Sequence, residues 1–278
     1  MKNTLLKITA IALLSLLAGE TQAQFNSLYY NNNRKRPTLR LRMLQRMDIG
    51  FHAGFGKAFF DQKISMMRPW WDENSQSNVD VVFSEENTFR LKGSSFGGNI
   101  GFYLPVGYVA RFTRFALNVE AYVTSSSYEI QDFKLFGTPT GAPLGNITCL
   151  SIAVPIGFDI KWGGQSTLSR HSWASTGIGG GIAPTYYMVT PATTGPNAKE
   201  LAVRPYVKAE FGFLTGIFWK VKGMVFFNKV TPGHWVTGNP EAVTTAEPYV
   251  DQTMRLNRFT YSLALSFNIG SLKWSRDW

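Results

Sequence analysis

Large apolar residues alternate with small or polar residues along several segments of this chain. The clearest segment is 259–269, FTYSLALSFNI, in which every second residue is large and apolar. Residues 148–162 alternate in the same way, and their polar positions include Asp159 and Lys161. A period of two places successive side chains on opposite faces of a β-strand. The pattern therefore predicts strands that have one apolar face and one small or polar face.

Eight strands are expected from this pattern. Their predicted ranges are 48–59, 94–105, 112–125, 148–162, 173–188, 202–214, 217–229 and 257–270. The connections between them alternate between long and short, at roughly 34, 6, 22, 10, 13, 2 and 27 residues, as in transmembrane β-barrels with tight turns on one side and expanded loops on the other. A strand of about 11 residues tilted near 45° also rises roughly 25 Å, the height of the apolar band of such a barrel.

The alternation has two physical interpretations. The apolar face points inward in a soluble sandwich or barrel, and outward toward lipid in a membrane barrel. The segregation of long and short connections favours the membrane barrel, because a sandwich has no reason to segregate them. Glycines on the inward register of the first, second and fifth predicted strands also suit the narrow interior of an eight-stranded barrel. We therefore predict an all-β fold, an eight-stranded antiparallel up-and-down transmembrane β-barrel.

The N-terminus has the pattern of a secretory signal peptide. Lys2 is followed by an apolar run at residues 8–18 and by small residues at Thr21 and Ala23, which predicts cleavage after Ala23. No later segment approaches the ~18 to 20 apolar residues of a transmembrane helix. The predicted domains are a signal peptide at 1–23, a basic periplasmic N-terminal tail at 24–45 and an outer-membrane β-barrel domain at 46–278.

Composition excludes several classes of protein and site. Of the 278 residues, 17% are charged and 14% are aromatic, whereas soluble domains average roughly 25% charged residues, so neither disorder nor a coiled coil fits. Cys149 is the single cysteine, which excludes a disulfide framework within the chain and zinc sites with two or more thiolates. The three histidines lack metal-ligand spacing. We therefore expect no metal and no cofactor.

Two segments of the chain resemble a known family. Residues 150–161, LSIAVPIGFDIK, and residues 179–186, GGGIAPTY, are similar to a proline-containing strand and the glycine-rich strand that follows it in the small outer-membrane β-barrels common in Bacteroidota. These barrels are related in architecture to OmpX and to the OmpA barrel. The resemblance covers nearly the whole mature chain. Because members include secretion and gliding-machinery components and adhesin-like proteins, it implies a fold and an outer-membrane location, and no reaction.

Charged residues on the polar faces of the strands are expected inside the barrel. A charge that faces lipid costs roughly 2–4 kcal/mol near the midplane, so charges on a spanning strand must point into the lumen. The predicted lumen charges are Arg114, Glu120, Asp159, Lys161, Arg204, Lys208, Glu210, Lys220, Lys222 and Arg258. They would either pair with one another and fill a closed lumen, or line a narrow conduit that prefers anions. The small bore of eight strands disfavours the conduit.

Two other segments are candidate partner contacts. One is a cationic cluster in the tail, formed by Arg34, Lys35, Arg36, Arg40 and Arg42. The other is the tryptophan pair Trp70 and Trp71 in the long first loop, residues 60–93. The tail would contact anionic headgroups, peptidoglycan carboxylates or an acidic partner, or would simply be solvated. Residues 79–83 would extend a hairpin whose edge and tryptophans bind a partner, or the loop would pack on its own barrel mouth. Nucleic acid is not an expected partner, because the protein is exported and lacks a reader motif.

The expected role is structural or interaction-based. We predict a monomeric, non-catalytic anchor in outer-membrane lipid that meets envelope or secretion-machinery proteins. A small porin-like pore is the alternative, and a lipid-modifying outer-membrane enzyme is the third hypothesis. Residues 93–97 match G-x-S-x-G, but they open a predicted strand and lack the strand–turn–helix context of a nucleophile elbow. His234 in the last predicted loop has no recognisable serine partner, so no catalytic site is expected.

Overall fold

The computed structural model describes residues 44–73, 76–110, 113–129, 134–135, 138–139, 146–167, 173–190, 197–227, 229–244 and 248–274. The predicted signal peptide and the five cationic residues of the predicted tail lie outside these residues. Within the described part of the chain, no helix is both long enough and apolar enough to cross a membrane.

Antiparallel β-strands make up most of the described chain. In chain order they are β1 (Met47–Asp72), β2 (Ser77–Ala110), β3 (Thr113–Glu129), β4 (Lys134–Leu135), β5 (Thr138–Pro139), β6 (Ile147–Ala153), β7 (Ile156–Gly163), β8 (Ala174–Thr190), β9 (Ala198–Thr215), β10 (Ile217–Phe227), β11 (Val230–Thr237) and β12 (Tyr249–Asn268). Two short helices accompany them, α3 (Gly164–Thr167) and the 3-10 helix η2 (Ile269–Lys273). The strands β4 and β5 pair only with each other in a small separate sheet.

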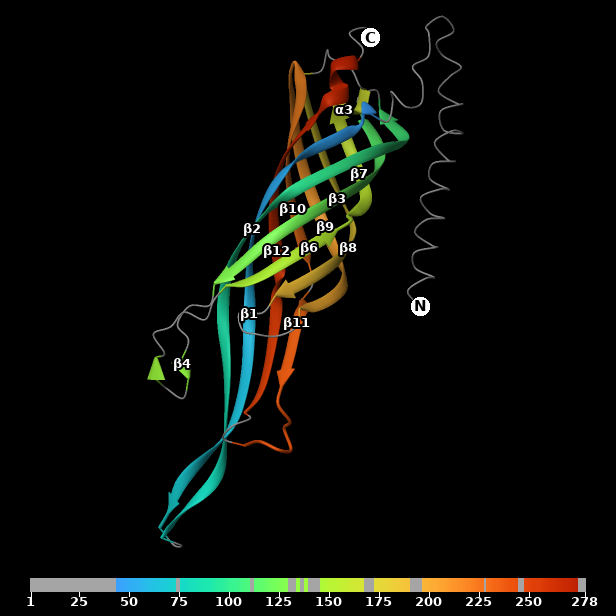
Figure 1. The fold of residues 1–278 in the computed structure, drawn as a ribbon. Coiled ribbons are helices and arrows are strands. Elements are labelled where there is room, and N and C mark those ends of the chain that lie inside the picture. Colours follow the sequence, from blue (N-terminus) through green and yellow to red (C-terminus); the bar gives the residue numbers. More distant parts are fainter. Residues whose placement is uncertain are drawn as a thin grey trace, which may run out of the picture.

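The main sheet closes on itself, because β1 pairs with both β2 and β12 (Figure 1). The ring runs β1–β2–β3–β6/β7–β8–β9–β10–β12, and β6 and β7 share one position in it. They are separated at Val154 and Pro155, where the proline has no N–H to give to the ladder. Every neighbouring pair is antiparallel and follows chain order, so the predicted all-β, antiparallel, up-and-down arrangement is present in the structure.

The connections differ in length at the two ends of the ring. At one end, called here the short-turn end, lie the β2–β3 turn, α3 between β7 and β8, and Gly216 between β9 and β10. Gly216 has a φ of 88°, a left-handed conformation that favours glycine. The β1–β2, β3–β6, β8–β9 and β10–β12 connections lie at the opposite end, called here the extended end. The long β3–β6 and β10–β12 connections both lie at the extended end, as predicted, but the β7–β8 connection at residues 164–173 is longer than the β8–β9 connection at residues 191–197.

The strands β1 and β2 continue well past the ring at the extended end (Figure 1). They stay paired from Met47 opposite Phe102 to Asp72 opposite Ser77. The predicted first loop is therefore a β-hairpin, and the expectation that residues 79–83 extend such a hairpin is confirmed. The sequence analysis missed β11, which pairs with β12 from Val230 opposite Leu256 onward. Beyond the ring, β11, β12, β1 and β2 thus form a projecting sheet.

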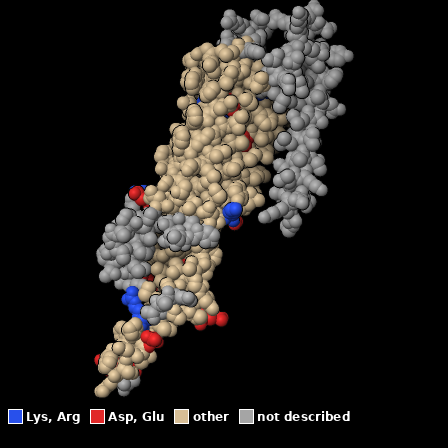
Figure 2. Space-filling model, in the orientation of Figure 1, with Lys and Arg blue, Asp and Glu red and all other residues tan. Residues whose placement is uncertain are grey.

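The two faces of the ring strands differ sharply in polarity. Large apolar side chains point outward and are exposed, among them Phe51 at 62%, Phe158 at 62% and Leu263 at 56%. In residues 49–55, 94–102, 115–123, 150–162, 174–186, 201–213, 217–227 and 259–267, every Asp, Glu, Lys and Arg is buried. Figure 2 shows few charged atoms over the wall of the ring and several charged side chains over the projecting part. The outer surface is therefore apolar where the interior is charged.

Candidate functional site

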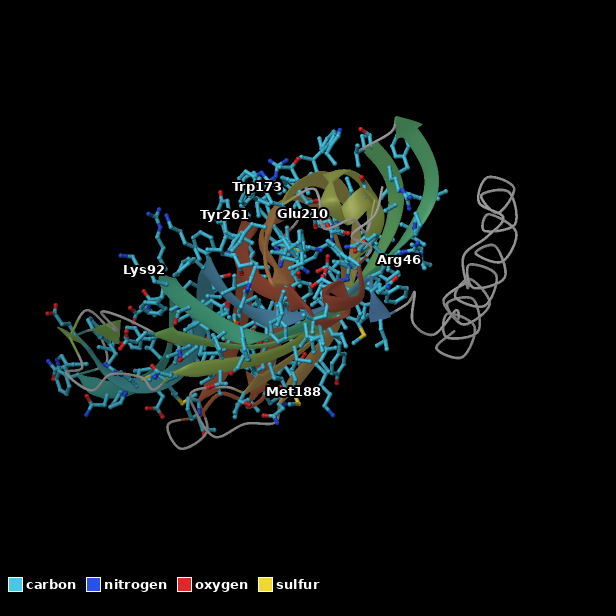
Figure 3. The ribbon with its side chains drawn as sticks, turned by 90° about the horizontal axis from the view of Figure 1, so that it is seen from above. Arg46, Lys92, Trp173, Met188, Glu210 and Tyr261 are labelled. Atoms are coloured by element: carbon cyan, nitrogen blue, oxygen red, sulfur yellow. The ribbon has the colours of Figure 1, made fainter. Side chains whose placement is uncertain are left out.

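A network of ion pairs fills the interior of the ring toward the short-turn end. Its members are four carboxylates and four ammonium groups, each at most 6% exposed: Asp48, Glu120, Asp159, Glu210, Lys161, Lys208, Lys220 and Lys222. They come from β1, β3, β7, β9 and β10, so the network crosses the lumen from wall to wall. Figure 3 shows Glu210 within the ring, whereas Trp173 and Tyr261 lie on its outer side.

Glu120 is one centre of the network. Its carboxylate accepts hydrogen bonds from Lys208 at 3.0 Å and Lys222 at 2.8 Å. It also accepts from the Tyr122 hydroxyl at 2.6 Å and from the Asn118 amide at 2.5 Å. A carboxylate bound by two cations and two neutral donors is fully satisfied, which is the condition for a buried charge to be tolerated.

Asp159 and Glu210 form the second centre. Lys208 lies 2.7 Å from Asp159, and Lys161 lies 3.3 Å from Asp159 while it also pairs with Glu210. Lys220 completes the chain of contacts, at 3.8 Å from Glu210. The same lysine lies 2.5 Å from Asp48. Four negative and four positive groups therefore balance, and the network carries no net formal charge.

Glycines on neighbouring strands make room for these acids. A Cβ placed on Gly101 would lie 2.7 Å from Glu120 Cγ, and one placed on Gly177 would lie 2.8 Å from Glu210 Cγ. Both distances are shorter than non-bonded carbon atoms allow, so alanine at either position would displace the neighbouring glutamate side chain. The glycine-rich faces of β2 and β8 are thus complementary to the charged faces of β3 and β9.

An apolar cluster fills the interior toward the extended end. Its buried members are Ala58, Phe60, Leu91, Tyr128, Ile147, Cys149, Tyr187, Val189, Val230, Trp235, Met254 and Leu256. Val230 and Trp235 belong to β11, which pairs with β12 and also contacts β8 and β9. The sequence analysis did not predict this part of the cluster, because β11 was not expected as a strand.

A cavity of about 70 Å³ lies between the ion-pair network and the apolar cluster. Tyr122 of the network side and Tyr128 of the cluster side both line it. Arg204 also lines it and is 4% exposed. Its guanidinium donates to the Tyr187 hydroxyl at 3.2 Å and the Thr260 hydroxyl at 2.9 Å. Arg204 is therefore inside the lumen as expected, but apart from the ion-pair network.

The remaining two predicted lumen charges differ in outcome. Arg114 is partly buried and stands opposite Lys161 in the β3–β7 ladder. Arg258 is exposed, and its guanidinium carbon lies 5.6 Å from the centre of the Phe259 ring. The prediction that Arg258 faces the lumen is wrong because β12 bulges there. Gly56 pairs with residue 260 and Ala58 with residue 256, so three β12 residues oppose one β1 residue.

The tip of the β1–β2 hairpin exposes apolar side chains to solvent. Trp70 is 58% exposed and Trp71 is 56% exposed. The Trp70 ring centre lies 5.9 Å from that of Phe83 on the opposite strand. Val79 and Val82 nearby are 43% and 49% exposed. The structure thus places both predicted tryptophan contacts on a protruding tip, away from the barrel mouth.

The catalytic motifs weighed from sequence lie in strands. Residues 93–97 are continuous with the rest of β2, and Gly93 packs against the Tyr128 ring. His234 lies on β11, 57% exposed, with Nε2 at 2.9 Å from an Asp251 oxygen. Within the described residues, no group of three or more His, Cys, Asp or Glu side chains could hold a metal ion. Asp48 was not in the predicted lumen set, although it shares the inward parity of Gly50 at the start of the first predicted strand.

Comparison with known proteins assigns no family. No family model matches the chain, and no curated protein matches it. Among solved structures, the outer membrane protease OmpT from Escherichia coli matches with a TM-score of 0.31 and 9% identity over 79% of this chain and 97% of that one. A FadL homologue from Pseudomonas aeruginosa matches with a TM-score of 0.19 and 8% identity over 81% and 90% of the two chains. The Salmonella injectisome secretin InvG matches with a TM-score of 0.17 and 8% identity over 80% and 59%.

Proposed function

We propose that this protein is an eight-stranded outer-membrane β-barrel that acts as a non-catalytic anchor for its projecting β1–β2 hairpin. The observation that carries the proposal is the inverted polarity of the ring, which buries its charges and exposes its large apolar side chains. In water, an exposed apolar surface of this extent is unfavourable, because each Å² costs roughly 25 cal/mol. In a bilayer the same surface matches its solvent, and the ring closes through the pairing of β1 with β12.

The filled interior favours an anchor over a pore. The ion-pair network and the apolar cluster occupy successive levels of the lumen, with a cavity of about 70 Å³ between them. The four carboxylates of the network balance its four ammonium groups, as expected for charges that pair with one another. The structural role of the buried charges is therefore the better supported of the two hypotheses that the sequence left open.

The hairpin is the part of the molecule best suited to meet a partner. It carries an exposed tryptophan pair on a two-stranded ribbon that projects beyond the ring, and aromatic side chains of this kind are frequent anchors of protein interfaces. By the topology of such barrels, the long connections face outward from the cell. An envelope or surface-assembly protein that recognises this tip is the proposed partner.

The membrane assignment is tested by gel mobility. Outer-membrane fractions of cells that express the full chain are compared boiled and unboiled, and extracted with urea or carbonate. We expect a band that migrates differently before boiling and stays with the membrane after extraction. Recovery of the protein in the soluble periplasmic fraction, without detergent, would contradict the proposal.

Planar-bilayer recording separates the anchor from the pore. The purified full chain should insert without measurable conductance, because both the charged and the apolar levels of the lumen are filled. Steady channels that scale with the amount of inserted protein would refute the anchor and restore the pore.

The hairpin role is tested by photocrosslinking in living cells. A photoreactive residue at Trp71 should yield a discrete adduct, and the same residue at Leu263 on the apolar wall serves as the matched control. A second variant replaces residues 66–83 with Asn-Gly between Ser65 and Ser84, which already face each other in the ladder. This variant should keep its heat-modifiable gel mobility and no longer bind the partner. Identical adducts from both positions would argue against a binding tip.

A further inference from the structure

A buried guanidinium without a carboxylate partner faces the cavity of the barrel interior. The Nη atoms of Arg204 donate to the Tyr187 and Thr260 hydroxyls and, at 3.5 Å, to the Phe226 carbonyl. The guanidinium carbon also lies 5.4 Å from the centre of the Phe226 ring. All of these partners are neutral. The Nε atom of Arg204 has no hydrogen-bond partner within the described part of the chain.

The four lysines of the ion-pair network show what this interior supplies to its other cations. Lys208 has Asp159 at 2.7 Å, Lys222 has Glu120 at 2.8 Å, and Lys161 and Lys220 pair with other carboxylates of the network. A buried charge is tolerated when it is paired and hydrogen-bonded, and is costly otherwise. Arg204 therefore lacks a counter-charge that each buried lysine has.

The cavity beside Arg204 is suited to a small anion. Hydroxyl groups line it, and they can rotate to donate: Ser95, Ser126, Tyr128, Ser151, Tyr187 and Thr260. No Asp or Glu is among its lining residues. Two lining residues also carry a buried polar atom that has no hydrogen-bond partner among the described residues, Nδ1 of His52 and Oγ of Ser262. At about 70 Å³ the space is large enough for an ion of halide size.

We propose that this cavity is a binding site for a monovalent, halide-sized anion that is held by Arg204 and the surrounding hydroxyls. The anion supplies the missing counter-charge and accepts hydrogen bonds from the rotatable hydroxyls. It is a structural ligand held between the ion-pair network and the apolar cluster. The site depends only on the barrel interior, so it stands or falls independently of the proposed anchor role of the hairpin.

Crystals of the full chain grown in sodium bromide provide the direct test. Bromide replaces chloride at similar size, and its anomalous scattering identifies the ion. We expect one strong anomalous peak in the cavity, within hydrogen-bond distance of Arg204. A cavity without bromide, empty or filled with water alone, would overturn the proposal.

Equilibrium unfolding gives an independent test on the protein in lipid vesicles. Urea unfolding is measured in chloride and in gluconate at equal ionic strength, because gluconate is several times larger than a halide ion. One site predicts that each tenfold rise in chloride above the dissociation constant raises the folding equilibrium constant about tenfold. Equal unfolding midpoints in the two salts would overturn the site. This measurement and the bromide crystals use the wild-type chain and need no variant to fold.

Substitutions then locate the site. Arg204→Gln should abolish the chloride dependence, whereas Arg204→Lys, which keeps the charge, should retain part of it. Arg255→Gln is the matched control, because Arg255 is an exposed arginine that pairs with Asp61 at 2.8 Å outside the lumen. Loss of chloride dependence in Arg255→Gln, or its full persistence in a folded Arg204→Gln, would contradict the assignment to Arg204.

Discussion

Replacing Glu120 by glutamine should show how strongly the barrel depends on its buried ion-pair network. The substitution keeps the size of the side chain and removes its charge. Glu120 is the one carboxylate within ion-pair distance of Lys222 in the described structure, and Lys222 is fully buried. Lys208, the other cation on Glu120, keeps Asp159 at 2.7 Å. The main consequence of the change is therefore a single buried ammonium group without a counter-charge.

The expected loss of stability follows from that count. Removing one partner of a buried pair costs about 3–5 kcal/mol, since the remaining charge stays desolvated. This corresponds to a fall in the folding equilibrium constant of roughly two to four powers of ten. A double variant, Glu120→Gln with Lys222→Met, removes both charges. It should recover most of the loss, because an apolar replacement of a buried pair is often neutral.

The assay is urea unfolding in lipid vesicles, followed by tryptophan fluorescence and by gel mobility. Glu86→Gln is the matched control, since Glu86 pairs with Lys63 at 2.8 Å, the same distance as the Glu120–Lys222 pair, but in an exposed position. Its cost should be no more than about 1 kcal/mol. If Glu120→Gln costs no more than Glu86→Gln, or if the double variant is no more stable than the single one, water screens the lumen and the argument from burial fails.

Two further predictions concern the wall and the interior cluster. Leu263→Arg on the apolar wall should lower the free energy of unfolding by about 2–4 kcal/mol and reduce outer-membrane assembly. The control, Thr253→Arg on the projecting sheet, should leave stability nearly unchanged. Equal effects of the two variants in the unfolding assay would mean that the wall does not face lipid. Cys149 is 2% exposed, so its thiol should resist maleimide in the unboiled protein and react after boiling. As a control, Asn78→Cys in a Cys149→Ser background should react at once. Rapid labelling of Cys149 in the unboiled protein would show that the apolar cluster opens.

The ring strands could be predicted from sequence because each has two unlike environments. One face of such a strand contacts an apolar environment and the other contacts charged groups, so apolar and polar residues alternate along it. Asp159 and Lys161 show this, because each lies between large apolar neighbours. Parity then places each charge on the inner face. It does not say which acid meets which lysine, since those contacts depend on how neighbouring strands are staggered around the ring.

The parts that were missed lack this contrast. The projecting hairpin has water on both sides near its tip, so Trp70 and Trp71 can be adjacent and both exposed, and alternation carries no information there. The strand β11 contains Pro232 and Gly233, residues that are depleted in strands, and its register shifts between Val230 and Gly233. Arg258 was misplaced because parity reasoning assumes an unbroken strand, and a bulge breaks that assumption.

The charged interior has a role that an apolar interior could not fill. With apolar side chains on both faces, a strand would gain as much from a register that is one residue out, because nothing would distinguish lipid from lumen. With Glu120, Lys208 or Lys222 on the inner face, the same slip turns a charge toward lipid at roughly 2–4 kcal/mol for each residue. Several such residues on one strand, as in β9 and β10, make the penalty additive along the strand. The ion-pair network thus determines the register of the ring. Because its charges pair with one another, their burial does not destabilise the fold.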